Sequence, residues 1–183
     1  DGVIYPEYVR INGEKVKIKT DTRTALRALE VVNDNRIGDY ERTMAVLFIM
    51  YGSIPKDETL WEPMLEQATR FLQRNDPEEG QRTEEPDMDI LFDEKYIMAS
   101  FMSDYGIDLS KENMHFWRYC DLIAGLTENC ILSRVRQIRS CNPDDYAEKD
   151  RHAIYRAKDQ LALPRRRTRE EQEAEERFEA LFD

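Results

Sequence analysis

YVRINGEKVKIKTDTRTALRALEVV, residues 8–32, decides the fold because it joins a strand pattern directly to a helix pattern. Apolar and polar residues alternate on both sides of Asn12-Gly13, the dipeptide best suited to a type I′ turn. We therefore predict a two-stranded antiparallel β-hairpin over residues 8–19. A lone hairpin is only marginally stable, so its apolar face should lie against a helix. That face is formed by Val9, Ile11, Val16 and Ile18.

A helix should follow the hairpin without a long loop. Asp21 is suited to the N-cap position, since its carboxylate can accept a backbone N–H of the first turn. The apolar residues behind it recur at helical spacing until Asn33-Asp34-Asn35 breaks the pattern. They are Ala25, Leu26, Leu29 and Val32.

Helical spacing of apolar residues returns repeatedly in the rest of the chain. The predicted helices begin near Asp39, Asp57, Phe92, Ser110, Ile131 and Asp144. In the first of them, Met44, Leu47, Phe48 and Tyr51 are expected on one inward face. Gly106, which follows Tyr105, should end the helix that begins near Phe92. Ser110 should cap the next helix, and Gly125 should end it. The fold class is therefore mainly α, a multi-helix bundle with an N-terminal two-stranded antiparallel β-hairpin.

The charge is concentrated in one stretch. The formal net charge of the chain is -11. Residues 76–94 contribute -8 of it, because they contain nine acidic side chains and one basic side chain, Arg82. With Pro77, Gly80 and Pro86 among them, residues 76–91 are predicted to form a solvated acidic loop. We expect residues 1–163 to form one helical domain that contains this loop, and residues 164–183 to form a charged extension.

Catalytic and cofactor motifs are missing from the sequence. The two histidines, His115 and His152, stand without a partner motif, and the three cysteines are too widely spaced for the usual zinc patterns. No Walker loop, dinucleotide glycine cluster or nucleophile elbow occurs. We expect no enzyme activity, no cofactor and no metal. The lack of a long apolar run and of a signal-peptide pattern predicts a cytoplasmic protein that binds no membrane.

The aromatic residues are the candidates for protein binding. Phe116, Trp117 and Tyr119 cannot all point one way on a helix, so part of this set is predicted to form an exposed partner groove. Phe178, Leu181 and Phe182 are the apolar anchors of the C-terminal extension and are further candidates. The net negative charge disfavours nucleic acid as a partner. A further hypothesis is a nucleic-acid-binding regulator, whose contacts would be Arg134, Arg136, Arg139 and Arg165–Arg169.

The motif order resembles a known family. It includes the hairpin, Ile90-Leu91-Phe92-Asp93, Tyr96-Ile97-Met98-Ala99-Ser100-Phe101, Tyr105-Gly106-Ile107-Asp108-Leu109, His115-Phe116-Trp117, Gly125-Leu126 and Arg139. Over residues 8–142 this order resembles the tail-assembly chaperones of siphophages and of prophages of Firmicutes. Two departures are a shorter spacing between the Phe-Asp and Tyr-Ile elements and a Phe at position 116, where the family often has a second Trp.

The resemblance implies a function in phage tail assembly. Its members are encoded between the major tail protein and the tape-measure protein, and they keep the tape-measure helix soluble while tube subunits are recruited. The implied partners are the tape-measure protein, the major tail-tube protein, or both, with self-association or pairing with a second chaperone as further expectations. Such a protein acts in the host cytoplasm and is absent from the mature virion. The alternative is a structural tail or head-to-tail connector component of the virion.

Overall fold

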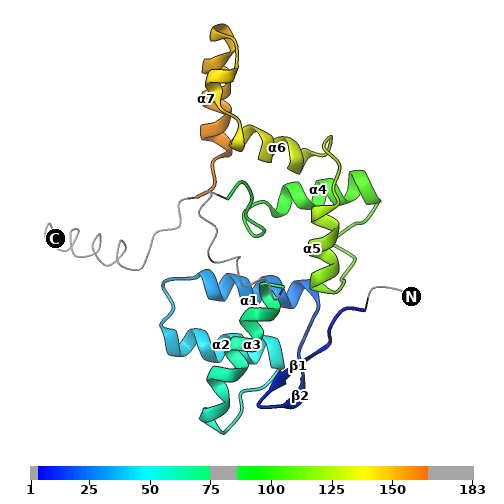
Figure 1. Cartoon of the computed structure of the whole chain (residues 1–183), viewed down its shortest axis with the longest axis vertical. Helices are drawn as coiled ribbons and strands as arrows, with labels where there is room; N and C mark the ends of the chain where they lie inside the picture. The colour runs from blue at the N-terminus through cyan, green and yellow to red at the C-terminus, as the bar shows by residue number, and fades with distance from the viewer. Residues whose placement is uncertain (1–3, 75–85, 165–183) are drawn as a thin grey trace, which may run out of the picture.

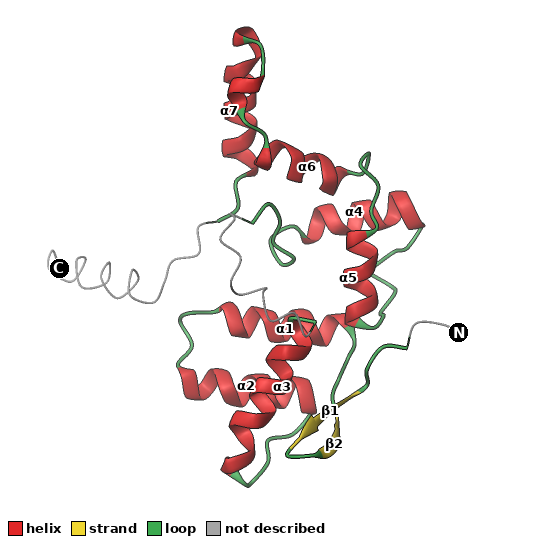
Figure 2. Cartoon of the chain, viewed as in Figure 1, coloured by secondary structure: helices red, strands yellow, loops and turns green. Residues whose placement is uncertain are grey.

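The computed structural model describes residues 4–74 and 86–164. Figure 1 shows an elongated molecule with the hairpin and three helices at one end and a projecting helix at the other. Figure 2 confirms that the described chain is mainly helical, with one N-terminal hairpin. The elements are β1 (Tyr8–Ile11), β2 (Glu14–Lys17), α1 (Thr22–Asn33), α2 (Asp39–Tyr51), the short 3₁₀ helix η1 (Glu58–Leu60), α3 (Trp61–Leu72), α4 (Glu94–Tyr105), α5 (Phe116–Ala124), α6 (Ile131–Ser140), the 3₁₀ helix η3 (Pro143–Asp145) and α7 (Glu148–Leu161).

The hairpin forms as predicted. Asn12 and Gly13 both have positive φ angles, 50° and 87°, as a type I′ turn requires. β1 and β2 pair antiparallel with Ile11 opposite Glu14. The inward face packs on α2 and α3, where Ile11 contacts a small cluster with Leu47 and Met64. The helices thus provide the support that the isolated hairpin lacks.

The main core joins α1 to α6. Asp21 caps α1 as predicted, because its Oδ1 accepts the backbone N–H of Thr24 at 3.0 Å. Ala25 and Ala28 are fully buried, and these small side chains let α1 pack closely against its neighbours. The larger buried side chains of this core are Ile18, Val46, Met50, Phe71, Ile97, Phe101, Phe116, Tyr119 and Leu132.

The prediction that Ser110 caps a helix is wrong. Residues 110–114 precede the helix, and α5 begins at Phe116 with His115 as its N-cap. Backbone pairing with the chain before α1 decides this start, since Phe116 donates to the carbonyl of Thr20 at 2.7 Å and Thr22 donates to that of Met114 at 2.8 Å. The Ser110 hydroxyl instead lies 2.5 Å from Asp108 Oδ1.

The ends of α4 and α5 follow the predicted glycines for different reasons. Gly106 ends α4 in the left-handed region at φ 67°, where glycine is favoured. Gly125 ends α5 at a φ of -89°, which any residue can adopt. A Cβ there would lie 3.0 Å from the hydroxyl oxygen of Tyr105, which donates to the carbonyl of Leu122 at 2.9 Å. Close packing, not backbone conformation, therefore favours glycine at position 125.

A buried ion pair holds the C-terminal part of the fold. Asp93 is fully buried, and both of its carboxylate oxygens accept from the Arg139 guanidinium, at 2.6 and 2.7 Å. Arg139 also donates to the carbonyls of Asp87 and Leu161. The described part of the acidic stretch, residues 86–94, is thus bound to the body where we predicted a solvated loop up to residue 91. Residues 75–85 and the extension beyond residue 164 lie outside the described chain.

The last two long helices differ from their predicted patterns. α6 begins at Ile131 as predicted and buries Leu132 and Val135, while Ile131 itself is 42% exposed. α7 begins at Glu148 after η3 rather than near Asp144, and none of its side chains is buried. It packs on α6 and projects from the body in Figure 1. Among the described helices, none is long and apolar enough to cross a membrane.

Candidate partner-binding surfaces

Two of the aromatic residues predicted to form a partner groove lie in the core. Phe116 is 1% exposed and Tyr119 is 2% exposed, and their stacked rings have centroids 6.4 Å apart. Burial raises the pKa of the Tyr119 hydroxyl well above its ordinary value. The prediction that these two residues present an exposed surface is therefore wrong, because α5 packs them inward. Phe178, Leu181 and Phe182 lie outside the described residues.

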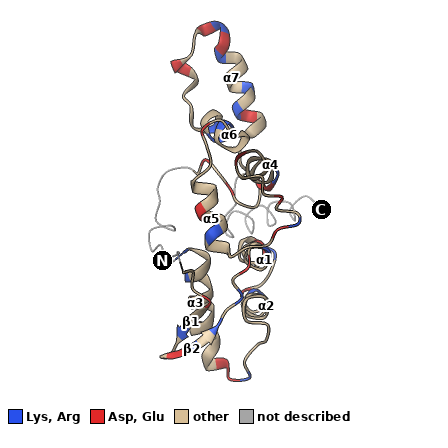
Figure 3. Cartoon of the chain, turned by 90° about the vertical axis from the view of Figure 1, so that its right-hand side faces the viewer, with Lys and Arg blue, Asp and Glu red and all other residues tan. Residues whose placement is uncertain are grey.

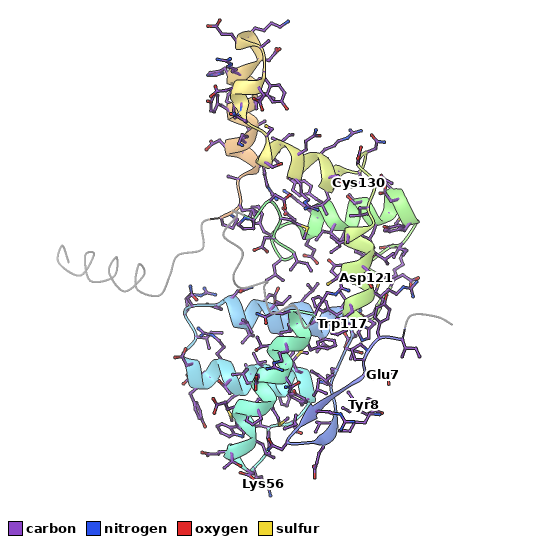
Figure 4. The ribbon with its side chains drawn as sticks, viewed as in Figure 1. Glu7, Tyr8, Lys56, Trp117, Asp121 and Cys130 are labelled. Atoms are coloured by element: carbon purple, nitrogen blue, oxygen red, sulfur yellow. The ribbon has the colours of Figure 1, made fainter. Side chains whose placement is uncertain are left out.

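Trp117 is half-buried and joins α5 to α3. Its indole N–H donates to the carbonyl of Phe71 at 2.8 Å, and its ring stacks on that of Phe71 with centroids 5.5 Å apart. Arg74 lies over the outer face of this region, 6.0 Å from the Trp117 ring, and pairs with Asp121. Figure 4 shows Trp117 and Asp121 on α5, above the start of the hairpin. A structural role accounts for most of the contacts of Trp117.

The residues before β1 are held at the start of α5. The Tyr5 ring stacks on that of His115 with centroids 5.0 Å apart, and the Tyr5 hydroxyl donates to Asp121 at 2.8 Å. This hydrogen bond to a carboxylate raises the pKa of Tyr5. His115 Nδ1 accepts the backbone N–H of Trp117, so the proton of a neutral ring lies on Nε2, 2.9 Å from the carbonyl of Pro6. His115 therefore has a structural position as a helix cap.

Internal ion pairs occupy two of the three arginines of α6. Only 6% of the Arg139 side chain is exposed, and Arg136 Nε lies 3.0 Å from Asp87 Oδ2. Arg134 is the exposed one of the three. Of the three α6 arginines that the nucleic-acid hypothesis names, Arg139 is therefore not available to bind phosphate. Arg165–Arg169 lie outside the described residues.

Large apolar side chains are exposed elsewhere. Those more than about a third exposed are Ile4, Tyr8, Tyr40, Phe48, Phe92, Met102, Ile131, Tyr146 and Tyr155. Two of the most exposed, Tyr40 at 61% and Phe48 at 58%, lie on α2. We had expected Phe48 on the inward face, but α2 turns Val46, Leu47 and Met50 inward instead.

The outer face of α2 is the clearest unpartnered apolar surface in the described chain. Tyr40, Met44 and Phe48 recur every four residues and so form a stripe along the helix. We call these three residues the α2 stripe. The ring of Tyr40 lies 5.8 Å from that of Trp61, at the start of α3, which extends the surface sideways. The sequence contained a signal for it, because residues 44–51 are apolar without interruption and leave no polar side for solvent.

Potential metal ligands do not gather in the part of the chain that the structure describes. Across residues 4–74 and 86–164, no group of three or more His, Cys, Asp or Glu side chains is placed to hold an ion. The three cysteines in this part form no disulfide.

These features define a small, mainly helical protein with an N-terminal hairpin and an exposed aromatic surface. A family model, that of the bacteriophage Gp15 protein, matches residues 4–163, and the chain belongs to this bacteriophage Gp15 family. Membership supports a phage structural or assembly protein. The match includes the whole of residues 8–142, on which the resemblance in motif order rests. Comparison with curated proteins and with solved structures found no match.

Proposed function

We propose that this protein is a tail-assembly chaperone that binds the tape-measure protein, the tail-tube protein, or both during phage tail morphogenesis. Membership of the bacteriophage Gp15 family supports a phage structural or assembly role, and the motif order over residues 8–142 favours the chaperone among such roles. It acts in the host cytoplasm and leaves before the virion is complete.

The observation that carries the proposal is the α2 stripe. An apolar face that its own fold leaves uncovered marks a protein-interaction site. Tyr40 and Phe48 are each more than half exposed although neighbouring residues of α2 are fully buried. A chaperone needs moderate, reversible contacts because it must release its client, and a stripe of three side chains can supply them.

Co-expression with each proposed partner tests the function. The full chain is expressed with the tape-measure protein, and separately with the tail-tube protein, of the same phage. We expect co-purification with at least one of them, and more soluble tape-measure protein than in its absence. Failure to associate with either protein, at low and at moderate salt, would overturn the proposal.

Mass spectrometry of purified virions separates the chaperone from the alternative of a structural tail or connector component. A chaperone is absent from the mature particle. Detection of this chain in a fixed ratio to the tail-tube protein would favour the structural component instead.

A further inference from the structure

The α2 stripe has an acidic border. Asp39 and Glu41 are exposed on α2, and Asp57, Glu58 and Glu62 are exposed around the start of α3, which the Tyr40–Trp61 contact places beside the stripe. Figure 3 shows both acidic and basic residues at this end of the molecule, beneath α2 and α3. The border therefore carries more negative than positive charge.

Two basic side chains lie near this border, and they offset only part of its charge. The Arg42 guanidinium is bound inward, where it donates to the carbonyls of Asp34 and Ile37 at 3.0 and 2.8 Å and pairs with Asp39. Lys56 is exposed, and Figure 4 places it at the far tip of the molecule. The border thus has five acidic side chains against two basic ones: Arg42, which is bound inward and paired with Asp39, and Lys56, which directly precedes Asp57.

The spacing of the stripe suits a helix as its occupant. Tyr40, Met44 and Phe48 form a ridge of the i, i+4 type, about 12 Å long at 1.5 Å per residue. Such ridges pack into the grooves of a second helix. α1 and α3 already pack against the other sides of α2, so a further helix would complete its burial.

We propose that the α2 stripe binds an amphipathic helix of a partner protein, with an apolar face flanked by Lys and Arg. A second copy of this chain is a poorer occupant, because a symmetric pair would bring two acidic borders together. The C-terminal extension, residues 164–183, is also poorer, since its seven acidic side chains outnumber its five basic ones. That this helix belongs to the tape-measure or tail-tube protein rests on the proposed function. Its apolar face and basic flanks are inferred from the α2 stripe and its acidic border alone.

The test uses the full chain and two synthetic helices of about six turns, each labelled with a fluorophore. Both carry the same leucine stripe; one is flanked by lysines and the other by glutamates. We expect the lysine helix to bind at least about tenfold more tightly, as measured by fluorescence anisotropy. Equal binding of the two helices would overturn the proposal.

Variants locate the binding site. Phe48→Ser and Tyr40→Ser should each weaken binding of the lysine helix about tenfold. Tyr155→Ser is the matched control, because Tyr155 is 54% exposed on α7 and lies far from α2. Circular dichroism checks that the variants are folded. An unchanged affinity in both α2 variants would overturn the proposal.

Two further outcomes identify a different occupant. A dimer that sedimentation detects in the native chain and that Phe48→Ser abolishes would mean that a second copy covers the stripe. Tighter binding of the lysine helix after removal of residues 165–183 would mean that the extension covers it. Either result overturns the proposal.

The co-expression experiment distinguishes failure of this inference from failure of the proposed function. If the native chain binds a tail protein and Phe48→Ser binds it equally well, the inference fails and the proposed function stands. If the native chain binds neither tail protein, the proposed function fails, while the synthetic helices still report on the stripe.

Discussion

α2 and α7 have nearly the same length, 13 and 14 residues, and opposite packing. α2 fully buries Val46, Leu47 and Met50 and still exposes Tyr40 and Phe48. α7 buries no side chain and projects from the body. One helix has more apolar surface than this fold can cover, and the other has too little to hold itself in place. The first is suited to a partner, and the second depends on a few polar contacts.

Removal of the Arg139 guanidinium should have the largest effect, because it holds α7 and the buried Asp93 together. Arg139→Ala leaves the fully buried Asp93 carboxylate without its cation, which should lower the free energy of unfolding by about 3–5 kcal/mol. Urea unfolding followed by circular dichroism measures this loss. Arg136→Ala is the control: its pair with Asp87 is partly exposed, at 40% and 36%, and should contribute at most about 1 kcal/mol.

A double variant tests whether this loss of stability comes from the unpaired charge of Asp93. Asp93→Leu combined with Arg139→Met replaces both charges by apolar groups, and should be more stable than Arg139→Ala alone. If the double variant is the less stable of the two, the loss comes from packing rather than from the unpaired carboxylate.

Two neighbouring residues test which face of α6, the helix that α7 packs on, is buried. Leu132→Ala should cost about 2–5 kcal/mol, since Leu132 is 1% exposed and its removal leaves a cavity. Ile131→Ala should change stability by less than about 0.5 kcal/mol, because that side chain is 42% exposed. The same unfolding experiment compares them. Equal losses would contradict the orientation of α6.

The parts of the fold that sequence predicted are those with local causes. Asn12-Gly13 requires positive φ angles, Asp21 needs only the amides of the next turn, and Gly106 ends a helix by its own backbone conformation. Each of these depends on residues within a few positions.

Prediction failed where distant contacts decide the outcome. The side on which Phe48 lies could not be inferred from periodicity, because residues 44–51 are apolar throughout. The start of α5 depends on pairing between Thr20 and Phe116, which removes Ser110 from the cap position. Asp93 and Arg139 are 46 residues apart, and nothing in either local sequence indicates their pairing. The candidate site moved from α5 to α2 for the same reason.

Removal of the N-cap of α1, the helix that packs on α2, should have a smaller effect on stability, and this effect should depend on pH. Asp21→Ala should lower the free energy of unfolding by about 1 kcal/mol at pH 7. Burial alone would raise the pKa of Asp21, but hydrogen bonds from Thr24 and Asn113 outweigh it, so the folded pKa lies below the ordinary 3.8. The carboxylate therefore stabilises the fold above pH 3.8, and this contribution is lost as the pH falls through the folded pKa.

Unfolding of the native chain and the variant at a series of pH values measures this dependence. The difference between them should be constant above about pH 5 and should shrink as the pH falls through the ordinary carboxyl pKa of 3.8 and then through the lower folded pKa. Asp21→Asn is the matched control, since asparagine also caps helices well but does not titrate in this range. A difference between native chain and Asp21→Ala that grows on acidification would contradict the argument.

The smallest global effect is expected from Lys158 on α7. Its ammonium group donates to the carbonyls of Arg139 and Cys141, and Lys158→Met keeps the apolar stem while removing these bonds. Global stability should change by less than about 0.5 kcal/mol. Amide hydrogen exchange in α7 should accelerate about fivefold, because two hydrogen bonds with a combined net contribution of roughly 1 kcal/mol no longer restrain local opening. Unchanged exchange in α7, with α2 as the internal reference, would show that apolar packing holds this helix.

The contacts of Arg139 also affect how mechanical load passes through the chain. One guanidinium binds the carbonyl of Asp87, which follows residues 75–85, and that of Leu161, which precedes residues 165–183. Tension applied at residue 164 would therefore reach residue 87 through the Arg139 side chain, beside the path through α7, Lys158 and α6. Two segments far apart in sequence share one anchor, and a pull on either is opposed at the same point.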